Sequence, residues 1–348
     1  HKKTIFYQNG IYCKKMKVNI IAEAGVNHNG NIVKAKKLAL EAKKIGADYV
    51  KYQIFNPDEI AIHNLQKTAY QKKNTNGDSD NQYDMLKKLS LTHDDFNKLI
   101  KYCKKINIKF LASVFDISSF DYLKKKSKTI KIGSSEISNF FLLKEIAKHN
   151  KNLIISTGMC NFVVIEKALK LLYESGQDKN KITLLHCNSA YPTPLSDANI
   201  LTMNKLKDTF KVSVGYSDHT LGKDAVYAAV ALGANTIEKH FTLNKNLKGP
   251  DHKISLDVVE FEEMVNGIRN ITKTLNIKKG KLTKSEKENA TLVKKFLVAK
   301  NYIKKGEKFS LENLTAKRTG GGIESMKINS ILNKKSKKLF LKNEIIKI

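Results

Sequence analysis

Short apolar runs rich in β-branched residues recur through the first two thirds of the chain, and polar, helix-like segments separate them. Such short runs are typical of buried strands. We expect eight strands, at Asn19–Gly25, Tyr49–Phe55, Phe110–Phe115, Thr129–Ser134, Asn152–Gly158, Ile182–Cys187, Val212–His219 and Thr236–Phe241. The segments between them, such as Ile32–Ile45 and Val163–Glu174, repeat apolar residues every three or four positions, which predicts amphipathic helices.

This alternation of strands and helices predicts an α/β protein. Eight βα units over about 250 residues indicate a (β/α)8, or TIM, barrel. A doubly wound sheet is the alternative, but no G-x-G-x-x-G motif follows the first expected strand.

The longest interval between expected strands runs from Asn56 to Lys109. Its first part, through Asp84, is polar and contains Asn-Gly and Asp-Ser-Asp. We expect a loop there, at the end of the barrel where active sites are built.

The pattern changes after about residue 270. We expect a tail at residues 1–15, a catalytic barrel at 16–275, a charged linker at 276–295 and a small module at 296–348. A module of about 50 residues is marginally stable alone. It should therefore pack against its own barrel or against a partner chain.

Charge changes this picture little, although the chain has 63 basic and 33 acidic residues and a formal net charge of +30. Only Arg269 and Arg318 are arginines, whereas bidentate recognition of phosphates and bases favours arginine. We therefore expect a solvated lysine surface and no nucleic-acid or membrane partner. A basic nucleic-acid-binding protein is the alternative from another functional class.

Membrane proteins, secreted proteins and zinc ribbons are disfavoured, because the sequence lacks the segments and motifs that are typical of them. No apolar run approaches the ~18–20 residues of a membrane span, and residues 1–15 lack the apolar centre of a signal peptide. The four cysteines form no C-x-x-C pair, which argues against a zinc ribbon and a disulfide framework. We expect a cytoplasmic protein.

Two histidines stand at the ends of neighbouring expected strands. His219 ends the seventh strand and His240 lies near the end of the eighth. Adjacent strands are about 5 Å apart, so the two imidazoles could share a metal ion. A single histidine in this position is more often a hydrogen-bonding residue, but the pair favours a metal site. His28 and His186 also lie near strand ends and could support it.

Lys51 and Lys131 lie inside apolar strand sequences, where an unpaired charge is costly. Together with Ser134, Ser156 and Ser217 they could hold phosphate and carboxylate groups. An internal ion pair and a Schiff-base lysine, as in aldolases, are the alternatives.

Glu23 is a carboxylate inside the first expected strand. Buried carboxylates are rare unless they are paired or functional. It is a candidate acid–base group, with a salt bridge to Lys51 or Lys131 as the alternative.

Ordered motifs over more than nine-tenths of the chain, from about Asn19 onward, resemble the N-acetylneuraminate synthase family, including legionaminate and pseudaminate synthases. The segments that carry the resemblance are IIAEAGVNHNG, VKYQIF, KIGSSEISN, ISTGM, LLHCNSAYPTP, VGYSDHT, IEKHFTL, GPDH and LVAKNYIKKGEKFSLENLTAKRTGGGI. The last segment is similar to the family's antifreeze-like (SAF) module.

The resemblance implies condensation of phosphoenolpyruvate with N-acetylmannosamine, or with a related 2-acetamido or 2,4-diacetamido hexose. The products would be a sialic-acid-type nonulosonate and phosphate, formed with cleavage of the C–O bond. It also implies a domain-swapped homodimer in which the small module of one subunit caps the active site of its partner.

Individual roles follow from the resemblance by motif. His219 and His240 would bind Mn²⁺ or Mg²⁺, and Glu23, Lys51 and Lys131 would be catalytic. The phosphoenolpyruvate contacts would be Lys51, Ser113, Lys131, Ser134, Ser156, Ser189 and Ser217. The amino-sugar contacts would be Gln53, Glu136, Tyr191 and Asp251, with Arg318 reaching the N-acetyl group from the partner's module.

Overall fold

The computed structural model describes residues 17–75, 81–275 and 280–347. The chain forms two compact units that divide after Asn276, and each is described by itself. The tail expected at residues 1–15 lies outside the described residues.

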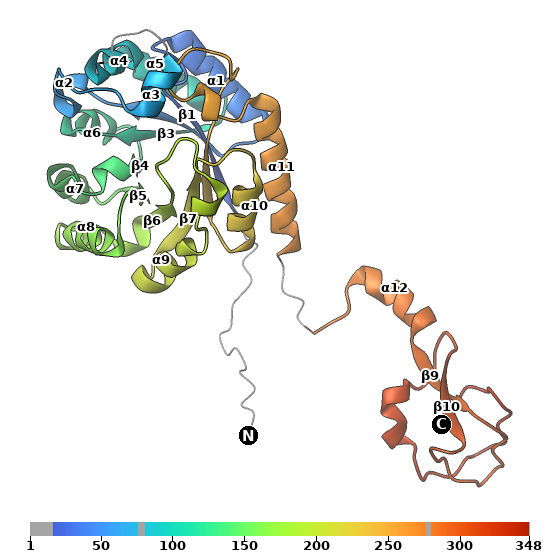
Figure 1. The fold of residues 1–348 in the computed structure, drawn as a ribbon. Helices are drawn as coiled ribbons and strands as arrows, with labels where there is room; N and C mark the ends of the chain where they lie inside the picture. The colour runs from blue at the N-terminus through green and yellow to red at the C-terminus, as the bar shows by residue number, and fades with distance from the viewer. Residues whose placement is uncertain (1–16, 76–80, 276–279, 348) are drawn as a thin grey trace. The chain divides into compact units, whose positions relative to one another are not determined.

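Eight parallel strands close into a barrel in the first unit, paired in sequence order with the last against the first (Figure 1). They are β1 (Asn19–Gly25), β2 (Tyr49–Ile54), β3 (Lys109–Val114), β4 (Thr129–Ile132), β5 (Asn152–Ser156), β6 (Ile182–His186), β7 (Ser213–Asp218) and β8 (Thr236–His240). The expected (β/α)8 barrel is confirmed.

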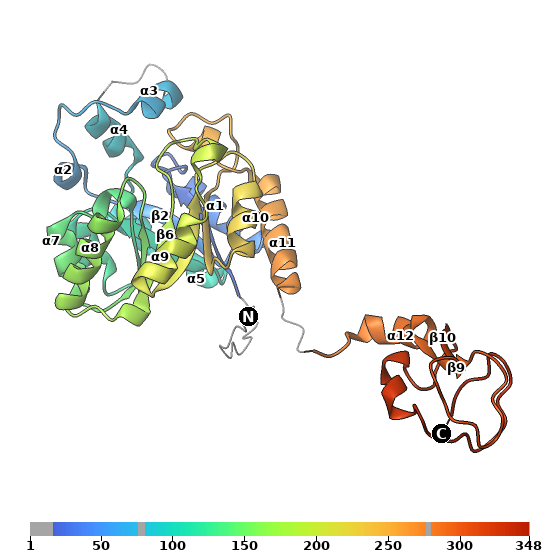
Figure 2. The same ribbon diagram turned by 60° about the horizontal axis from the view of Figure 1, so that its bottom comes forward.

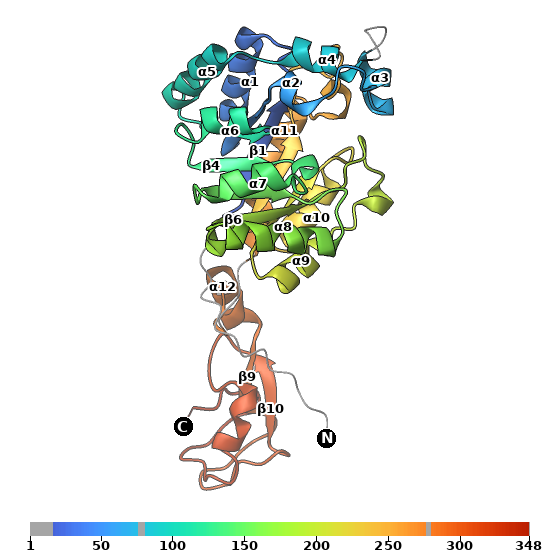
Figure 3. The same cartoon turned by 90° about the vertical axis from the view of Figure 1, so that its left-hand side faces the viewer.

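Helices surround the barrel and shield its outer face (Figures 1 and 3). They are α1 (Ile32–Lys44), α5 (His93–Lys105), α6 (Ile117–Leu123), α7 (Phe140–Ala147), α8 (Phe162–Glu174), α9 (Thr202–Phe210), α10 (Asp224–Ala231) and α11 (Val258–Thr274). Polar side chains cap most of them: Thr92 caps the start of α5 and Asp257 caps the start of α11, each in a capping box. The main core lies between this ring and the strands.

A smaller apolar layer fills the inside of the barrel. Ile21, Leu111, Ile154 and Leu185 are buried there together. Side chains alternate between the two faces of a strand, so the next inward residues are Glu23, Ser113, Ser156 and Cys187. The apolar layer thus forms the floor beneath a polar layer at the carboxyl ends of the strands.

The prediction of a loop from Asn56 to Asp84 is wrong, because this stretch contains short helices. These are α2 (Pro57–Ile60), α3 (Ala69–Thr75) and α4 (Gln82–Leu89), which lie together at one end of the barrel (Figure 2). Side-chain oxygens of Asn56 and Asn81 accept backbone N–H groups at the starts of α2 and α4. Helices this short are stabilised by caps and by tertiary packing, and they are too short to show a long periodic pattern in the sequence.

The second unit contains α12 (Lys284–Val293) and an antiparallel pair, β9 (Lys295–Ala299) and β10 (Leu314–Arg318). Its own core includes Leu297, Phe309, Ile331 and Phe340. The interval expected as a linker contains α12, which begins with a capping box at Thr283. None of the helices in the described ranges has both the length and the apolar character to span a membrane.

Candidate active site

A cavity of about 450 Å³ opens at the carboxyl ends of the barrel strands. It brings together every site residue that the sequence predicted in the barrel. These are Glu23, Lys51, Gln53, Ser113, Lys131, Ser134, Glu136, Ser156, Ser189, Tyr191, Ser217, His219, His240 and Asp251. Arg318 belongs to the second unit and stands at the exposed end of β10.

Lys51 is at the centre of a buried charge cluster. Its Nζ lies 3.3 Å from Glu23 Oε2 and 3.0 Å from Glu238 Oε1, and it donates to Ser113 Oγ at 3.2 Å. Burial alone would lower the pKa of Lys51, but the two carboxylates outweigh burial and raise that pKa. Lys51 is therefore charged, and the internal ion pair considered from the sequence is present.

Lys131 has a different environment on β4. Its Nζ donates to Ser156 Oγ at 2.6 Å and to the Ile132 carbonyl at 3.2 Å, while Glu238 Oε1 is 3.8 Å away. Burial lowers the pKa of Lys131 to about 8. At neutral pH most of the population still carries the positive charge.

Glu238 joins the two lysines and was not predicted as a site residue. It accepts a hydrogen bond from Ser217 Oγ at 3.0 Å, and its side chain is 6% exposed. Burial alone would raise its pKa, but Lys131 and Lys51 lower it to about 2. The sequence held one signal, because Glu238 lies two residues before His240 and thus on the same face of β8.

Glu23 differs from Glu238 in its tendency to hold a proton. Burial raises the pKa of Glu23 more than Lys51 lowers it, and the charge of Glu238 raises it further. Gln53 Nε2 donates to Glu23 Oε1 at 3.2 Å. A buried carboxyl with a raised pKa is a candidate proton donor and acceptor.

The serine side chains converge around Gly158, which follows β5. Its N–H donates to Ser134 Oγ at 3.0 Å. A Cβ atom at this position would lie 2.3 Å from Ser189 Oγ and 2.9 Å from Cys187 Sγ. Only glycine lets the chain approach these side chains so closely.

The two histidines face each other across the ends of β7 and β8. Their ring centroids are 5.5 Å apart. His219 Nδ1 bonds to the carbonyl of Asn188, so Nδ1 is the donor and Nε2 is left to bind a ligand. His240 Nδ1 has no hydrogen-bond partner among the described residues, and Asp251 Oδ2 lies 3.8 Å from it.

Both imidazoles are neutral at pH 7. Burial lowers the pKa of His219 to about 4 and that of His240 well below its usual value. Neutral buried imidazoles with an unused nitrogen fit a divalent metal ion. Within the described parts of the chain no group of three or more His, Cys, Asp or Glu residues could hold a metal. Substrate and water would therefore have to complete the coordination.

Aromatic rings and Asp251 form the outer part of the cavity. Tyr191 lies 4.3 Å from the His219 ring and stacks on Tyr70, which comes from α3, with centroids 5.1 Å apart. Burial and the charge of Glu23 raise the pKa of Asp251 to about 7. Tyr70 could not be identified from the sequence, because α3 was not predicted.

The histidines proposed as supporting residues lie outside the cavity lining. His28 is buried and its Nδ1 accepts a hydrogen bond from the Gly30 N–H. His186 Nε2 bonds to the Ala198 carbonyl at 2.8 Å. Both therefore contact the backbone of nearby loops.

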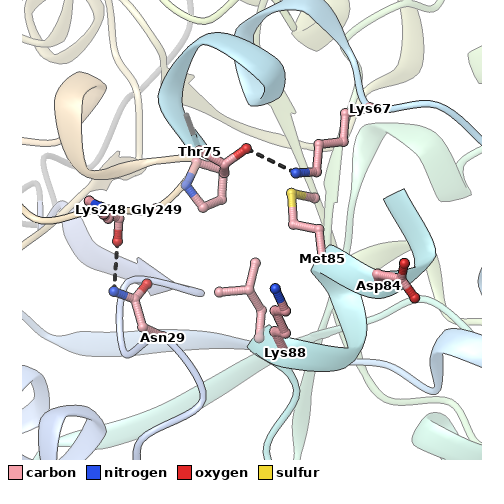
Figure 4. A pocket seen from close by; sticks show the side chains of 10 residues that line it. Asn29, Lys67, Thr75, Asp84, Met85, Lys88, Lys248 and Gly249 are labelled. Atoms are coloured by element: carbon pink, nitrogen blue, oxygen red, sulfur yellow. Dashed lines mark hydrogen bonds between the residues drawn. The ribbon is translucent and has the colours of Figure 1, made fainter. Parts of the chain in front are cut away.

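A second hollow of about 240 Å³ adjoins the main cavity and shares Met85, Leu89 and Pro250 with it (Figure 4). Hydrogen bonds join its walls: Lys67 Nζ donates to Thr75 Oγ1 at 3.1 Å, and Asn29 Nδ2 donates to the Lys248 carbonyl at 2.8 Å. Met85 of α4 thus lines both hollows.

Comparison with known proteins agrees with this arrangement. Residues 38–280 match the NeuB family and residues 294–348 match the SAF domain. The chain is 47% identical over 332 residues to the N,N'-diacetyllegionaminic acid synthase of Campylobacter jejuni, covering 95% of this chain and 99% of the relative. It is 34% identical over 335 residues to a pseudaminic acid synthase of the same species, covering 95% and 96%.

A solved structure extends the comparison. The N-acetylneuraminic acid synthetase from Leptospira borgpetersenii is similar with a TM-score of 0.68 and 31% identity, over 79% of this chain and 90% of that one. The resemblance inferred from the motifs and the SAF module at the C-terminus are confirmed. The chain belongs to the NeuB family, and the relatives it resembles are named as synthases of legionaminic and pseudaminic acids.

Proposed function

We propose that this protein joins phosphoenolpyruvate to an N-acetylated amino sugar and water, giving a nine-carbon nonulosonate and phosphate. One observation carries the proposal: two buried lysines, a ring of serine hydroxyls and two neutral imidazoles converge in a single cavity. The lysines and serines suit the phosphate and carboxylate of one substrate, and the imidazoles suit a metal beside the other.

For the sugar, we propose a 6-deoxy-2,4-diacetamido hexose rather than N-acetylmannosamine. The chain is more similar to a relative named N,N'-diacetyllegionaminic acid synthase, at 47% identity, than to relatives named N-acetylneuraminate-9-phosphate synthase, at 37%, or pseudaminic acid synthase, at 34%. The product would then be a legionaminic acid.

His219 and His240 would hold Mn²⁺ or Mg²⁺, and the ion would supply Lewis-acid polarisation of the sugar's aldehyde oxygen. The residues of the chain would do the remaining work. Lys51 and Lys131 would hold the carboxylate and phosphate of phosphoenolpyruvate and balance their charge.

The bonds would change in a fixed order. C3 of phosphoenolpyruvate attacks the aldehyde carbon, forming the new C–C bond. Glu23, whose pKa is raised, donates a proton to the former aldehyde oxygen. Water then adds to C2 and returns a proton to Glu23. The new C2 hydroxyl becomes a carbonyl as the C–O bond to phosphate breaks, and its proton leaves with the phosphate.

The proposal is tested by phosphate release from phosphoenolpyruvate with a panel of hexoses and added Mn²⁺. We expect release that depends on an N-acetylated sugar and a nonulosonate product by mass spectrometry. Absence of release with every N-acetylated hexose would overturn the proposal. Borohydride trapping of a lysine–substrate adduct would instead support the Schiff-base aldolase, for which the lowered pKa of Lys131 is the relevant observation.

We also propose a cytoplasmic, domain-swapped homodimer in which Arg318 of one subunit contacts the sugar in its partner's barrel. Arg318 is exposed at the end of β10 and belongs to a compact unit separate from the barrel. An exposed guanidinium on a separate unit is free to serve another subunit's site.

A further inference from the structure

The active-site cavity has two chemically different sides. One side carries Lys51, Lys131 and the serine hydroxyls. The other, which we call the apolar wall, consists of Val26, Ile60, Met85, Leu86, Leu89 and Phe115. These six residues belong to one apolar cluster at the edge of the barrel.

Helix α4 supplies half of the apolar wall because of its spacing. Gln82, Met85, Leu86 and Leu89 follow the i, i+3, i+4, i+7 pattern and therefore share one helical face, which lines the cavity. Tyr83 lies off this face and donates to Asp58 Oδ1 at 2.6 Å. This bond attaches α4 to α2 and fixes the direction of the apolar face.

Amide groups border the apolar wall. Gln82 Nε2 donates to Gln71 Oε1 at 3.3 Å, and Gln71 Oε1 also accepts the N–H of Thr68 at 2.9 Å. Both glutamine side chains line the cavity. The wall thus offers an apolar surface with amides at its margin, which matches the methyl and amide groups of an acylamido substituent.

This chemistry distinguishes between the two candidate sugars. N-acetylmannosamine has a hydroxyl at C6 and another at C4, which would lose hydrogen bonds to water against Met85 and Leu86. A 6-deoxy-2,4-diacetamido hexose has a methyl group at C6 and an acetamido group at C4. Its methyl groups would be buried favourably on the same surface.

We infer that the α4 face formed by Gln82, Met85 and Leu86 determines sugar specificity, selecting a 6-deoxy hexose with a second acylamido group at C4. This inference rests on the proposed condensation with phosphoenolpyruvate. It adds three residues that would contact the sugar, all from α4, a helix that was not predicted from the sequence.

The test compares kcat/KM for the two sugars in wild type, Met85→Gln and Leu86→Gln. Lys87→Gln is the matched control, because Lys87 is exposed on the same helix and does not line the cavity. We expect wild type and the control to prefer the 6-deoxy-2,4-diacetamido hexose. Each wall variant should reduce that preference about tenfold, the range for one apolar contact, with KM for phosphoenolpyruvate unchanged.

The outcomes are separable. An equal loss for both sugars, or a wild-type preference for N-acetylmannosamine, would overturn the specificity role while leaving the condensation intact. Absence of phosphate release with either sugar would overturn the proposed function and the inference with it. Circular dichroism monitors folding, and Leu86→Gln, at a partly exposed position, remains decisive if the buried Met85 variant unfolds.

Discussion

At the scale of single residues, the active site balances charge before any substrate binds. Lys51 and Lys131 are matched by Glu238 and Glu23 within one buried cluster. The two lysines are not equivalent, because Lys51 contacts both carboxylates whereas Lys131 lies 3.8 Å from Glu238 alone. Lys131 is therefore the cation whose charge responds to pH near neutrality.

Activity should fall as pH rises through about 8. Burial lowers the pKa of Lys131 to about 8, so its charge is present below that pH and lost above it. Loss of the cation weakens attraction for phosphoenolpyruvate. The measurement is kcat/KM for phosphoenolpyruvate against pH, which reports groups in the free enzyme. A profile that stays level well above pH 8 would contradict this role.

Replacing Glu238 with Gln should shift the fall in kcat/KM for phosphoenolpyruvate to lower pH. Glu238 is the largest influence that raises the pKa of Lys131 against burial, so its neutral isostere leaves the lysine easier to deprotonate. We expect a shift of about one pH unit, the size of a nearby charge effect. If kcat/KM for phosphoenolpyruvate falls at the same pH in Glu238→Gln as in wild type, Glu238 contributes to stability alone.

His219→Ala should abolish Mn²⁺-dependent turnover, because one of the two imidazoles facing the cavity is removed. Mn²⁺ binding measured by electron paramagnetic resonance should weaken at least about tenfold. His149→Ala, at an exposed histidine on the barrel exterior, is the control. Wild-type Mn²⁺ affinity in His219→Ala would contradict the proposed metal site.

At the scale of elements, a buried ion pair joins β7 to β8 directly behind the two histidines. Asp218 precedes His219 and Lys239 precedes His240, and the two side chains are 0% and 1% exposed. Asp218 also accepts bonds from Tyr216 and from Thr220. Since neighbouring residues on a strand point to opposite faces, this pair lies outside the barrel while the imidazoles lie inside.

Lys239→Met should destabilise the protein by about 3–5 kcal/mol, because it leaves the Asp218 charge buried without its partner. Urea unfolding followed by circular dichroism measures this change. Lys98→Met is the control: its pair with Asp94 is exposed, so we expect no measurable effect. Equal unfolding midpoints for the two variants would contradict the structural role of the buried pair.

Strands that repeat along the chain can be predicted from the sequence, whereas elements whose limits depend on a local contact cannot. All eight strands were located, and β1 ends at the predicted residues because its apolar run is bounded by Gly25. β4 ends two residues earlier than predicted, since Ser134 begins a 3₁₀ turn. α4 was missed because Asn81 caps a helix of eight residues whose apolar face is evident only once it packs on Val26 and Phe55.

The same difference applies to the site. His219 and His240 could be paired from sequence, because strand ends converge in any closed barrel. The contact between Tyr70 and Tyr191 could not be predicted from the sequence, because it depends on the path of α3. Glu238 was accessible in principle from its period-two spacing to His240, but its partners on β2 and β4 become known only from the register of the barrel.

At the scale of the whole molecule, the chain combines a barrel that holds the cavity with a separate unit that holds Arg318. The second unit has its own small apolar core and matches the SAF domain. If Arg318 serves a partner's barrel, neither unit of a single chain completes a site alone. Activity would then depend on which chains assemble together.

Arg318→Ala should raise KM for the sugar far more than KM for phosphoenolpyruvate, because the proposed guanidinium contact is to the N-acetyl group alone. Mixing decides whether this contact comes from the partner. At a sugar concentration well below the raised KM, His219→Ala and Arg318→Ala subunits should each be nearly inactive, and they should regain activity when unfolded and refolded together. A mixed dimer contains one intact barrel capped by one intact Arg318, so random pairing should restore about one quarter of wild-type activity. If Arg318 instead served its own barrel, every site in every mixed dimer would lack one of the two groups, and the mixture would remain as inactive as its components.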